Sequence, residues 1–205
     1  RPKDPDLEIT RRVQELLKLR QASCSVYADE IPKEEWKRIL LREGDRTDAI
    51  LVLGGDGTML RAARDTADSQ IPMLGINLGT LGYLTEEEKR GMEDAIDRLV
   101  AGSYQVEDRM MLCGQIYRQG RMEEENSALN DITITRCGHL RMLYFQIYVN
   151  GKLLKEYHAD GIIIATPTGS TGYNMSAGGR LVEPGAQMIL LTPVCPHTLQ
   201  TRSIV

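Results

Sequence analysis

Residues 48–64 read DAILVLGGDGTMLRAAR. The apolar residues 50–53 are typical of a buried strand, and residues 59–64 favour a helix. The glycines between them carry no Cβ, so backbone N–H groups can come close to a phosphate, and the start of the helix adds a partial positive charge. The stretch therefore predicts a strand, a tight phosphate-binding turn and a helix.

Asp56 is an unusual residue for a phosphate-binding turn, because its carboxylate would repel a phosphate. The repulsion is overcome if Asp56 holds Mg²⁺ or accepts a proton from an attacking hydroxyl, and both roles belong to phosphoryl transfer. The alternative is a turn aspartate that bonds to its own backbone. The P-loop pattern and a GxGxxG pattern between a strand and a helix are both missing from the sequence, so neither a P-loop enzyme nor a Rossmann dehydrogenase is indicated.

A second run of small residues, 166–179, reads TPTGSTGYNMSAGG and follows the strand-type segment 161–165. Small and hydroxyl-bearing residues would let the backbone approach an adenine and a ribose, and Tyr173 offers a flat face for stacking. Asn130 and Asp131 stand just before the strand-type segment 132–134. An amide beside an acid can read a base edge and a sugar hydroxyl, although a polar turn at the start of a strand fits the pair as well.

The order of predicted elements indicates two domains. Helix-type segments 5–17, with Asp4 as N-cap, and 33–42 alternate with strand-type segments 24–27, 50–53 and 73–76, which predicts a layered α/β domain with a mostly parallel sheet. Ligands bind at the carboxyl ends of such strands, where residues 54–58 and 77–84 fall. A charged helical stretch, 85–102, leads to a β-rich part in which Asn150 and Gly151 predict a tight hairpin. We therefore expect an α/β domain over residues 1–102 and a β-rich, sandwich-like domain over residues 103–205.

Both ends of the sequence look cut. The first predicted helix has no strand before it, although a βαβ unit normally begins with one, and the last residues are apolar. We expect further residues at both ends, and those after residue 205 would complete the β-rich domain.

Composition excludes several classes of protein. The 205 residues are 41% hydrophobic and 26% charged with a formal charge of −4, which is typical of a soluble globular chain and does not favour a nucleic-acid partner. The longest apolar runs have the length of strands and predict no membrane span. The four cysteines, Cys24, Cys113, Cys137 and Cys195, form no Cys-x-x-Cys pair, so no zinc site or disulfide framework is predicted, and a reducing cytoplasm is the expected location.

Taken in order, residues 54–58, residues 77–84 (NLGTLGYL), the Asn130–Asp131 pair and residues 160–179 resemble the motifs of the NAD kinase family, in its bacterial ATP–NAD kinase form. The resemblance covers essentially the whole chain, and residues 166–179 are its most specific part. It implies transfer of the γ-phosphoryl group of ATP to the 2′-hydroxyl of the adenosine ribose of NAD, which gives NADP. It also implies a divalent metal such as Mg²⁺ and a homodimer or homotetramer.

The resemblance implies a role for each matching residue of the first domain. Asp56 becomes the catalytic residue, which orients or deprotonates the ribose hydroxyl and could also contact the metal. Gly57 brings the backbone close to the ligand, and Tyr83 adds an aromatic contact, with core packing as its alternative. Arg61, one helical turn past the glycines, would point toward the ATP phosphates, although an exposed helix arginine is an equally good interpretation.

In the second domain the resemblance makes Asn130 and Asp131 contacts of the dinucleotide. Asp160 would lie near the nicotinamide half of NAD, with His158 and Arg141 as basic candidates, and a solvated hairpin arginine is the simpler account of Arg141. The remaining binding residues belong to the second run: Thr168, Thr171, Gly172, Tyr173, Asn174, Met175 and Ser176. Gly172 stands where the family often has alanine, which should loosen the loop slightly.

Two other functions stay open. Diacylglycerol-type lipid kinases share the Gly-Gly-Asp-Gly-Thr turn, but they need an apolar groove for acyl chains, and the Asn130–Asp131 pair and residues 166–179 argue against them. A non-catalytic NAD or NADP sensor could keep the same pocket. Asp56 argues against a sensor, because a protein that only binds needs no acid beside a phosphate.

Overall fold

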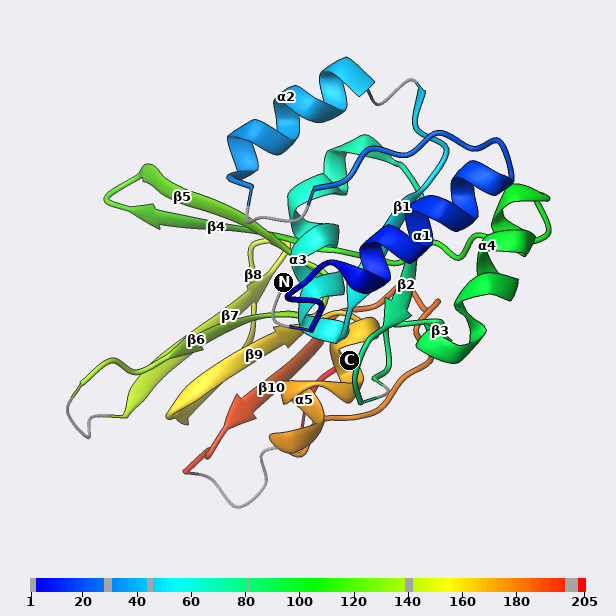
Figure 1. Cartoon of the computed structure of the whole chain (residues 1–205). Coiled ribbons are helices and arrows are strands. Elements are labelled where there is room, and N and C mark those ends of the chain that lie inside the picture. Colours follow the sequence, from blue (N-terminus) through cyan, green and yellow to red (C-terminus); the bar gives the residue numbers. More distant parts are fainter. Residues whose placement is uncertain (1–2, 28–30, 44–45, 81, 139–141, 198–202) are drawn as a thin grey trace. The chain divides into compact units, whose positions relative to one another are not determined.

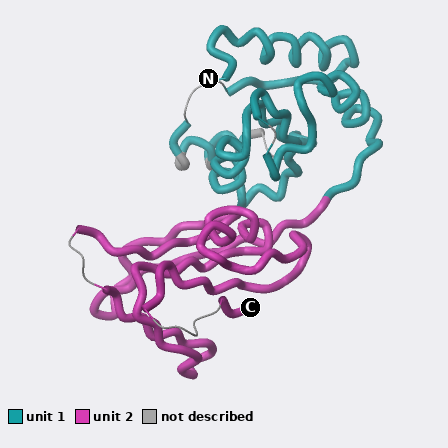
Figure 2. Tube along the Cα trace, turned by 90° about the horizontal axis from the view of Figure 1, so that it is seen from below, with its two compact units in different colours: residues 1–106 teal, residues 107–205 magenta. Residues whose placement is uncertain are grey.

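The structure is a computed structural model that describes residues 3–27, 31–43, 46–80, 82–138, 142–197 and 203–205. The chain divides into two compact units, residues 1–106 and residues 107–205 (Figure 2). The first unit is an α/β unit with a parallel sheet and the second is β-rich, which confirms the predicted fold class.

The sheet of the first unit has the order β1 (Ile50–Gly54), β2 (Met73–Asn77), β3 (Glu87–Glu88), and its strands are parallel. β1 and β2 pair in register from Ile50 opposite Met73 to Gly54 opposite Asn77. The carboxyl ends of these two strands are therefore level, so the loops that follow them start side by side.

Four helices accompany the sheet of the first unit in the described residues, and the first of them buries one apolar face. They are α1 (Glu8–Leu19), α2 (Lys33–Glu43), α3 (Asp56–Thr66) and α4 (Met92–Val100), with short 3₁₀ turns at Ala67–Ser69 and Lys89–Gly91. Ile9, Val13, Leu16 and Leu17 of α1 are buried, and they form a core with Ile76, Met92 and Ile96. The spacing of three and four residues places these α1 side chains on one face, which packs against β2 and α4.

α1 begins at Glu8, three residues later than the predicted first turn at Pro5, because Leu7 adopts a left-handed conformation with φ 55°. The Asp4 side chain nevertheless forms hydrogen bonds with the first turn of the helix. Its buried carboxylate accepts hydrogen bonds from the Ile9 amide at 3.1 Å, the Thr10 amide at 2.9 Å and the Thr10 hydroxyl at 2.6 Å. The segment before α1 is thus fixed to the helix it precedes.

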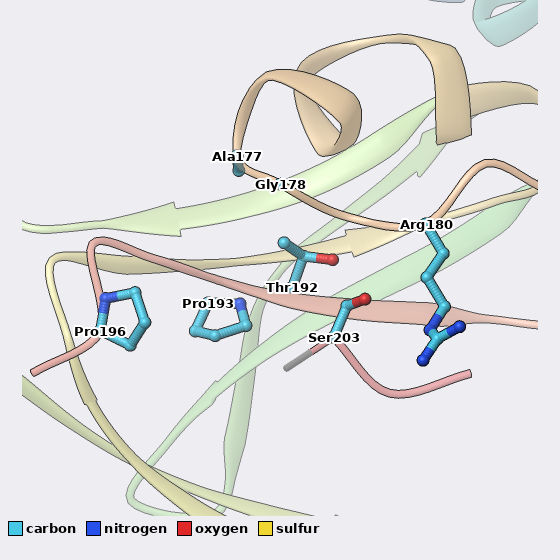
Figure 3. Close-up of a pocket in the computed structure, with 7 residues that line it drawn as sticks. All are labelled: Ala177, Gly178, Arg180, Thr192, Pro193, Pro196 and Ser203. Atoms are coloured by element: carbon cyan, nitrogen blue, oxygen red, sulfur yellow. The ribbon is translucent and has the colours of Figure 1, made fainter. Parts of the chain in front are cut away.

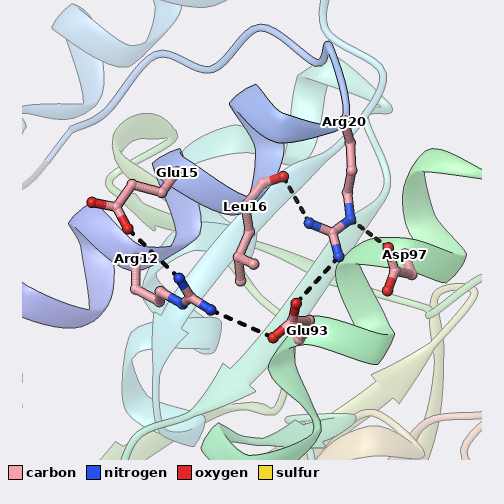
Figure 4. A network of polar contacts seen from close by, with 6 residues as sticks. All are labelled: Arg12, Glu15, Leu16, Arg20, Glu93 and Asp97. Carbon is pink, nitrogen blue, oxygen red and sulfur yellow. Dashed lines mark hydrogen bonds and ion pairs between the residues drawn. The ribbon is translucent and has the colours of Figure 1, made fainter.

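A polar network joins α1 to α4 at the edge of this core (Figure 4). Arg20 donates to the Leu16 carbonyl at 2.9 Å and pairs with Asp97 and, at 3.6 Å, with Glu93. Arg12 pairs with Glu15 at 3.7 Å and with Glu93 at 3.6 Å. The hydrogen bond between Arg20 and Asp97 raises the pKa of the guanidinium and lowers that of the carboxyl group. Because most of these groups are exposed, the network orients the two helices more than it stabilises them.

Two predicted elements of the first unit are wrong. Residues 24–27 form no strand: they are exposed, and no neighbouring strand pairs with them in the described part of the chain. The charged stretch 85–102 is not one helix, because Glu87 and Glu88 add a short parallel strand beside β2 and the helix starts only at Met92. In both places tertiary pairing, rather than local propensity, decides the backbone conformation.

The second unit is β-rich, as predicted, and its strands pair antiparallel. β6 (Asp131–Thr135), β9 (Gly161–Ala165) and β10 (Leu190–Val194) form a sheet with β9 in the centre. β4 (Leu112–Arg118) pairs with β5 (Arg121–Ala128), and β7 (Leu143–Val149) pairs with β8 (Lys152–Ala159) (Figure 1). Asn150 and Gly151 join β7 to β8 with φ 50° and 75°, which confirms the tight hairpin.

After β9 the chain folds into a 3₁₀ turn (Thr168–Thr171) and the short helix α5 (Tyr173–Ser176). Ile163, Ala165 and Leu190 form the buried core of this sheet, against which Ala177, Val182 and Val194 pack. Across the described residues of both units, every helix is too short or too polar to cross a membrane.

Candidate nucleotide-binding site

Two loops meet at the carboxyl ends of β1 and β2, as predicted. We call residues 54–58 the glycine loop and residues 77–84 the asparagine loop. The Leu78 amide donates to the Gly54 carbonyl at 3.2 Å, which joins the loops where they leave the sheet. A side chain at Gly54 would collide with Thr58, since its Cβ would lie 2.4 Å from the Thr58 hydroxyl oxygen. The close return of the chain into α3 therefore depends on glycine.

The carboxylate of Asp56 is held by the asparagine loop. Its Oδ2 accepts a hydrogen bond from the Tyr83 amide at 2.8 Å, and its Oδ1 accepts one from the Leu84 amide at 3.1 Å. Gly82 permits this approach, because a Cβ there would lie 2.1 Å from Asp56 Oδ1. In the described part of the chain, the Asp56 carboxylate bonds to these two amides and not to its own turn, unlike an ordinary turn aspartate. Each carboxylate oxygen keeps a lone pair for a hydroxyl or a metal ion.

The asparagine loop is itself held by the buried side chain of Asn77. Its amide nitrogen donates to the Thr80 carbonyl at 2.7 Å and to the Thr85 hydroxyl at 3.1 Å, and its oxygen accepts from the Gly79 amide at 2.7 Å. Asn77 thus fixes the loop that presents the Tyr83 and Leu84 amides. The Tyr83 ring is 72% exposed, so it lies outside the core and is accessible to a ligand.

Gly57 and Arg61 lie on α3. The space around the Cβ position of Gly57 is open, with no atom of the described residues within 4 Å, so a ligand can approach the backbone there. Arg61 is an exposed residue of the same helix, a little more than one turn beyond Asp56. Its proposed contact with phosphates stays a prediction.

In the second unit the start of β6 lies against the turn that follows β9. The Thr166 amide donates to the Asn130 carbonyl at 2.8 Å, and the Thr166 hydroxyl donates to the Leu129 carbonyl at 2.6 Å. Gly169 lies directly against Asn130, since a Cβ added at Gly169 would be 2.1 Å from the Asn130 carbonyl oxygen. The two sequence-distant segments predicted to bind the dinucleotide are therefore joined by backbone contacts.

Several polar groups at this junction remain available to a ligand. Among the described residues, the buried side-chain atoms without a hydrogen-bond partner are Asn130 Oδ1, Thr168 Oγ1 and Tyr157 OH. Asn130 and Thr168 both belong to the predicted site, and burial of an unpaired polar group costs about 1–3 kcal/mol. Asp131 Oδ1 accepts a hydrogen bond from the Thr133 hydroxyl at 3.1 Å. Asp131 Oδ2 would lie 3.9 Å from a Cβ at Gly172. These groups can supply the donors and acceptors that a sugar or a base requires.

The residues of 171–176 divide into exposed and buried groups. Tyr173 and Met175 are 45% and 43% exposed, Ser176 is exposed and Thr171 is half-buried. Asn174 is fully buried: its amide donates to the Ser170 and Arg180 carbonyls at 3.2 and 2.9 Å, and its oxygen accepts from Thr192 at 2.7 Å. Asn174 therefore holds the loop together, and a ligand contact would have to replace one of these bonds.

The remaining predicted residues lie at the other end of β9. Asp160 pairs with Arg136 at 3.3 Å, and the His158 ring packs against Tyr144 with 4.9 Å between the centroids. Asp160, expected near the nicotinamide half of NAD, is thus paired with an arginine of its own unit, and its contact with a ligand stays a prediction. Arg141 lies outside the described residues.

A hollow in the second unit was not predicted. It has a volume of about 360 Å³ and is lined by Ala177, Gly178, Arg180, Thr192, Pro193, Pro196 and Ser203 (Figure 3). The lining is formed by the segment after α5 and by β10 and the residues after it, so the hollow belongs to the second unit.

An α/β unit with a glycine loop that holds a carboxylate, followed by a β-rich unit with an amide- and hydroxyl-bearing turn, defines a nucleotide-binding protein of two units. Family models agree: residues 5–104 match the ATP-NAD kinase N-terminal domain, and residues 129–205 match the ATP-NAD kinase C-terminal domain. The chain belongs to the NAD kinase family, a family of phosphotransferases.

Curated relatives carry the same family name. The chain is 41% identical over 212 residues to an NAD kinase of Lachnospira eligens, and it is 57% identical over 159 residues to an NAD kinase of Agathobacter rectalis. The alignments cover 99% and 78% of this chain, and 70% and 55% of the relatives' lengths. The chain thus corresponds to a large part of each relative and not to all of it.

Two solved structures share the fold. One is a yeast NADH kinase complexed with NADH, with a TM-score of 0.74 and 28% identity over 94% of this chain and 57% of that one. The other is an NAD kinase from Archaeoglobus fulgidus in complex with ATP, with a TM-score of 0.74 and 26% identity over 96% of this chain and 72% of that one. One of these neighbours was thus solved with NADH and the other with ATP.

Proposed function

We propose that the protein which carries this sequence is an NAD kinase, which transfers the γ-phosphoryl group of ATP to the 2′-hydroxyl of the adenosine ribose of NAD and so makes NADP. The observation that carries the proposal is the position of Asp56. Its carboxylate lies in the glycine loop and is oriented by the Tyr83 and Leu84 amides, an arrangement that simple binding of a phosphate would not need.

Asp56 is the catalytic residue in this proposal. With one lone pair of each oxygen occupied by a backbone amide, the carboxylate cannot rotate freely, and its remaining acceptor sites can bind the ribose hydroxyl and take its proton. The nearby start of α3 and the backbone at Gly57 would face the phosphates of ATP. Arg61 would add positive charge one turn farther along.

The second unit would bind NAD. Asn130, Asp131 and Thr168 offer polar atoms at the junction of β6 with the turn after β9, and Tyr173 offers an exposed ring for stacking. Thr171, Gly172, Met175 and Ser176 would complete the contact surface. We keep Asn174, His158 and Asp160 as proposed contacts, with Asn174 acting in addition through the loop it stabilises.

A divalent cation fits this site as a companion of ATP. Among the described residues there is no cluster of three or more His, Cys, Asp or Glu side chains that could hold a metal ion by themselves. Mg²⁺ is commonly held by one or two carboxylates together with substrate phosphates, and Asp56 can offer one carboxylate oxygen. When bound, the ion would neutralise charge on the phosphates during transfer.

We further propose a cytoplasmic location and a homodimer or homotetramer. All four cysteines are exposed free thiols, which a reducing compartment preserves. Light scattering on the full-length protein measures the assembly, and a monomer with full activity would contradict it.

The test of function is NADP formation from NAD, ATP and Mg²⁺ by the full-length protein, compared with its Asp56→Asn variant. We expect kcat to fall by about 10²–10⁴ in the variant, the range that a general base contributes, while the Kd of NAD changes little. Asp68→Asn, an exposed aspartate in the turn after α3, is the matched control and should retain full activity.

Either of two results would contradict the proposal. A folded full-length protein that binds NAD but forms no NADP would favour the sensor function. Equal activity in Asp56→Asn and in the control would show that Asp56 is not the catalytic residue.

A further inference from the structure

The side chain of Lys3 lies against the glycine loop and the asparagine loop, although Lys3 is distant from both in the sequence. Its ammonium nitrogen is 2.9 Å from the position that a Cβ of Gly55 would occupy and 2.6 Å from that of Gly79. Lys3 Cε is 3.1 Å from the same position at Gly79. The side chain therefore lies in the space beside both glycines, which we call the slot, and an added Cβ at either position would displace its end.

Among the described residues, the ammonium group of Lys3, which is an exposed residue, forms no hydrogen bond or ion pair. An exposed lysine normally extends its charge into water, away from backbone. Here the charge instead lies against the two loops that lead into and support the start of α3, and its three N–H donors remain available.

The backbone before α1 keeps Lys3 in this place. The neighbouring Asp4 carboxylate is buried and accepts hydrogen bonds from the Ile9 and Thr10 amides and from the Thr10 hydroxyl. The Leu7 amide also donates to the Asp4 carbonyl at 3.1 Å. Lys3 is therefore attached to a fixed point of the first unit, which lowers the entropy lost when its ammonium binds a ligand.

The charges around the slot favour an anion. The first N–H groups of α3 have no partner within the helix and carry its partial positive charge, and Lys3 adds a full positive charge beside them at Gly55. Asp56 is adjacent in sequence, but its oxygens face the Tyr83 and Leu84 amides. A phosphate group bound here would receive a charge-assisted hydrogen bond from the ammonium group.

We propose that Lys3 binds a nucleotide phosphate at the glycine loop and so positions the phosphate chain relative to Asp56. The inference rests on the proposed function for the identity of its ligands, which are the triphosphate of ATP and the diphosphate of NAD. No sequence pattern marks Lys3, because the glycines that it contacts, Gly55 and Gly79, follow it in the sequence by about 50 and 76 residues.

The test is calorimetric titration of the full-length protein with ATP, with NAD and with adenosine, in wild type, Lys3→Met and Lys18→Met. Lys18 is an exposed lysine in the last turn of α1 and is the matched control for loss of one charge. We expect Lys3→Met to weaken the binding of ATP or NAD about tenfold or more, as for a lost hydrogen bond to a charged group, and to leave adenosine binding unchanged. Weakening of ATP alone assigns the triphosphate, and weakening of NAD alone assigns the diphosphate.

Two outcomes overturn the proposal: ATP and NAD affinities equal to those of Lys18→Met, or an equal loss of affinity for adenosine, which shows a structural effect. If Lys3→Met does not fold, the Gly79→Ala variant tests the proposal instead. Its added methyl group displaces the Lys3 ammonium, while the charge of Lys3 is retained. Unchanged ATP and NAD affinities in Gly79→Ala would then overturn it. These titrations need no turnover, so a protein that makes no NADP would refute the proposed function without deciding the role of Lys3.

Discussion

At the scale of single residues, Gly169 in the second unit stands where a side chain would overlap the backbone of a neighbouring segment. Gly169 lies against the Asn130 carbonyl, and a Cβ there would overlap the oxygen at 2.1 Å. Gly172, three residues later, has more room, since its Cβ would lie 3.4 Å from Asn130 Nδ2 and from the Gly169 carbonyl oxygen. Neither residue has a positive φ, so the difference between them is one of space and not of backbone strain.

We therefore predict that Gly169→Ala lowers the free energy of unfolding by about 1–3 kcal/mol, the usual cost of overpacking. Gly172→Ala is the matched control and should change it by less than about 0.5 kcal/mol. Urea unfolding of both variants measures the difference. Equal stability of the two would mean that the turn after β9 moves away from β6 without cost.

Asn174 shows the limit of sequence interpretation at this scale. Its place in the run 171–176 predicts a ligand contact, but the structure buries it and occupies both ends of its amide. Its partners Arg180 and Thr192 lie beyond the run, so no pattern within the run distinguishes Asn174 from the exposed Tyr173 and Met175 beside it.

At the scale of elements, the periodic segments could be predicted and the pairings could not. The buried face of α1, strands β1 and β2, and the β7–β8 hairpin each have a local cause in apolar spacing or in the Asn150–Gly151 turn. Residues 24–27 have strand-type residues but no partner strand, whereas Glu87 and Glu88 pair with β2 despite poor strand propensity. Strand formation needs a neighbour, and only the tertiary structure supplies it.

Asp4 gives a prediction for α1. Burial raises the pKa of its carboxyl group, but hydrogen bonds from Thr10 and Ile9 outweigh this effect and leave the pKa below its ordinary value. A lowered folded-state pKa means that the charged group stabilises the fold above the unfolded-state pKa of about 3.9, and that this contribution is lost as the pH falls through the folded-state value.

Accordingly, Asp4→Ala should lower the free energy of unfolding by about 1 kcal/mol at pH 7, the typical cost of a lost helix cap. The difference from wild type should shrink as the pH falls below about 4. Asp6→Ala, which removes an exposed carboxylate two residues away, is the control. A difference that stays constant down to pH 3 would contradict a role for the charge.

At the scale of the whole molecule, the family and its two kinds of unit were predictable because their motifs are contiguous in the sequence. Gly54 to Thr58 and Asn77 to Leu84 follow strands that pair in register, so their meeting follows from parallel topology alone. Lys3 was not predictable, because nothing local shows that the segment before α1 returns to these loops. The contacts that residues 54–58 and 130–131 make within their own units suggest a division of labour between phosphate chemistry and dinucleotide binding.

This division predicts separable kinetic effects in the full-length protein. Asn130→Ala removes a half-buried amide whose buried Oδ1 has no partner among the described residues, so the variant loses a ligand contact and no hydrogen bond made by that oxygen. We expect the KM for NAD to rise up to about tenfold, the value of one neutral hydrogen bond, with the KM for ATP unchanged.

Asn126→Ala on β5, which removes an exposed amide that donates to Glu124, is the control. Steady-state kinetics with each substrate varied in turn measures both constants. A parallel rise in both KM values would contradict the division, because it would mean that the second unit contributes to ATP binding as strongly as to NAD binding.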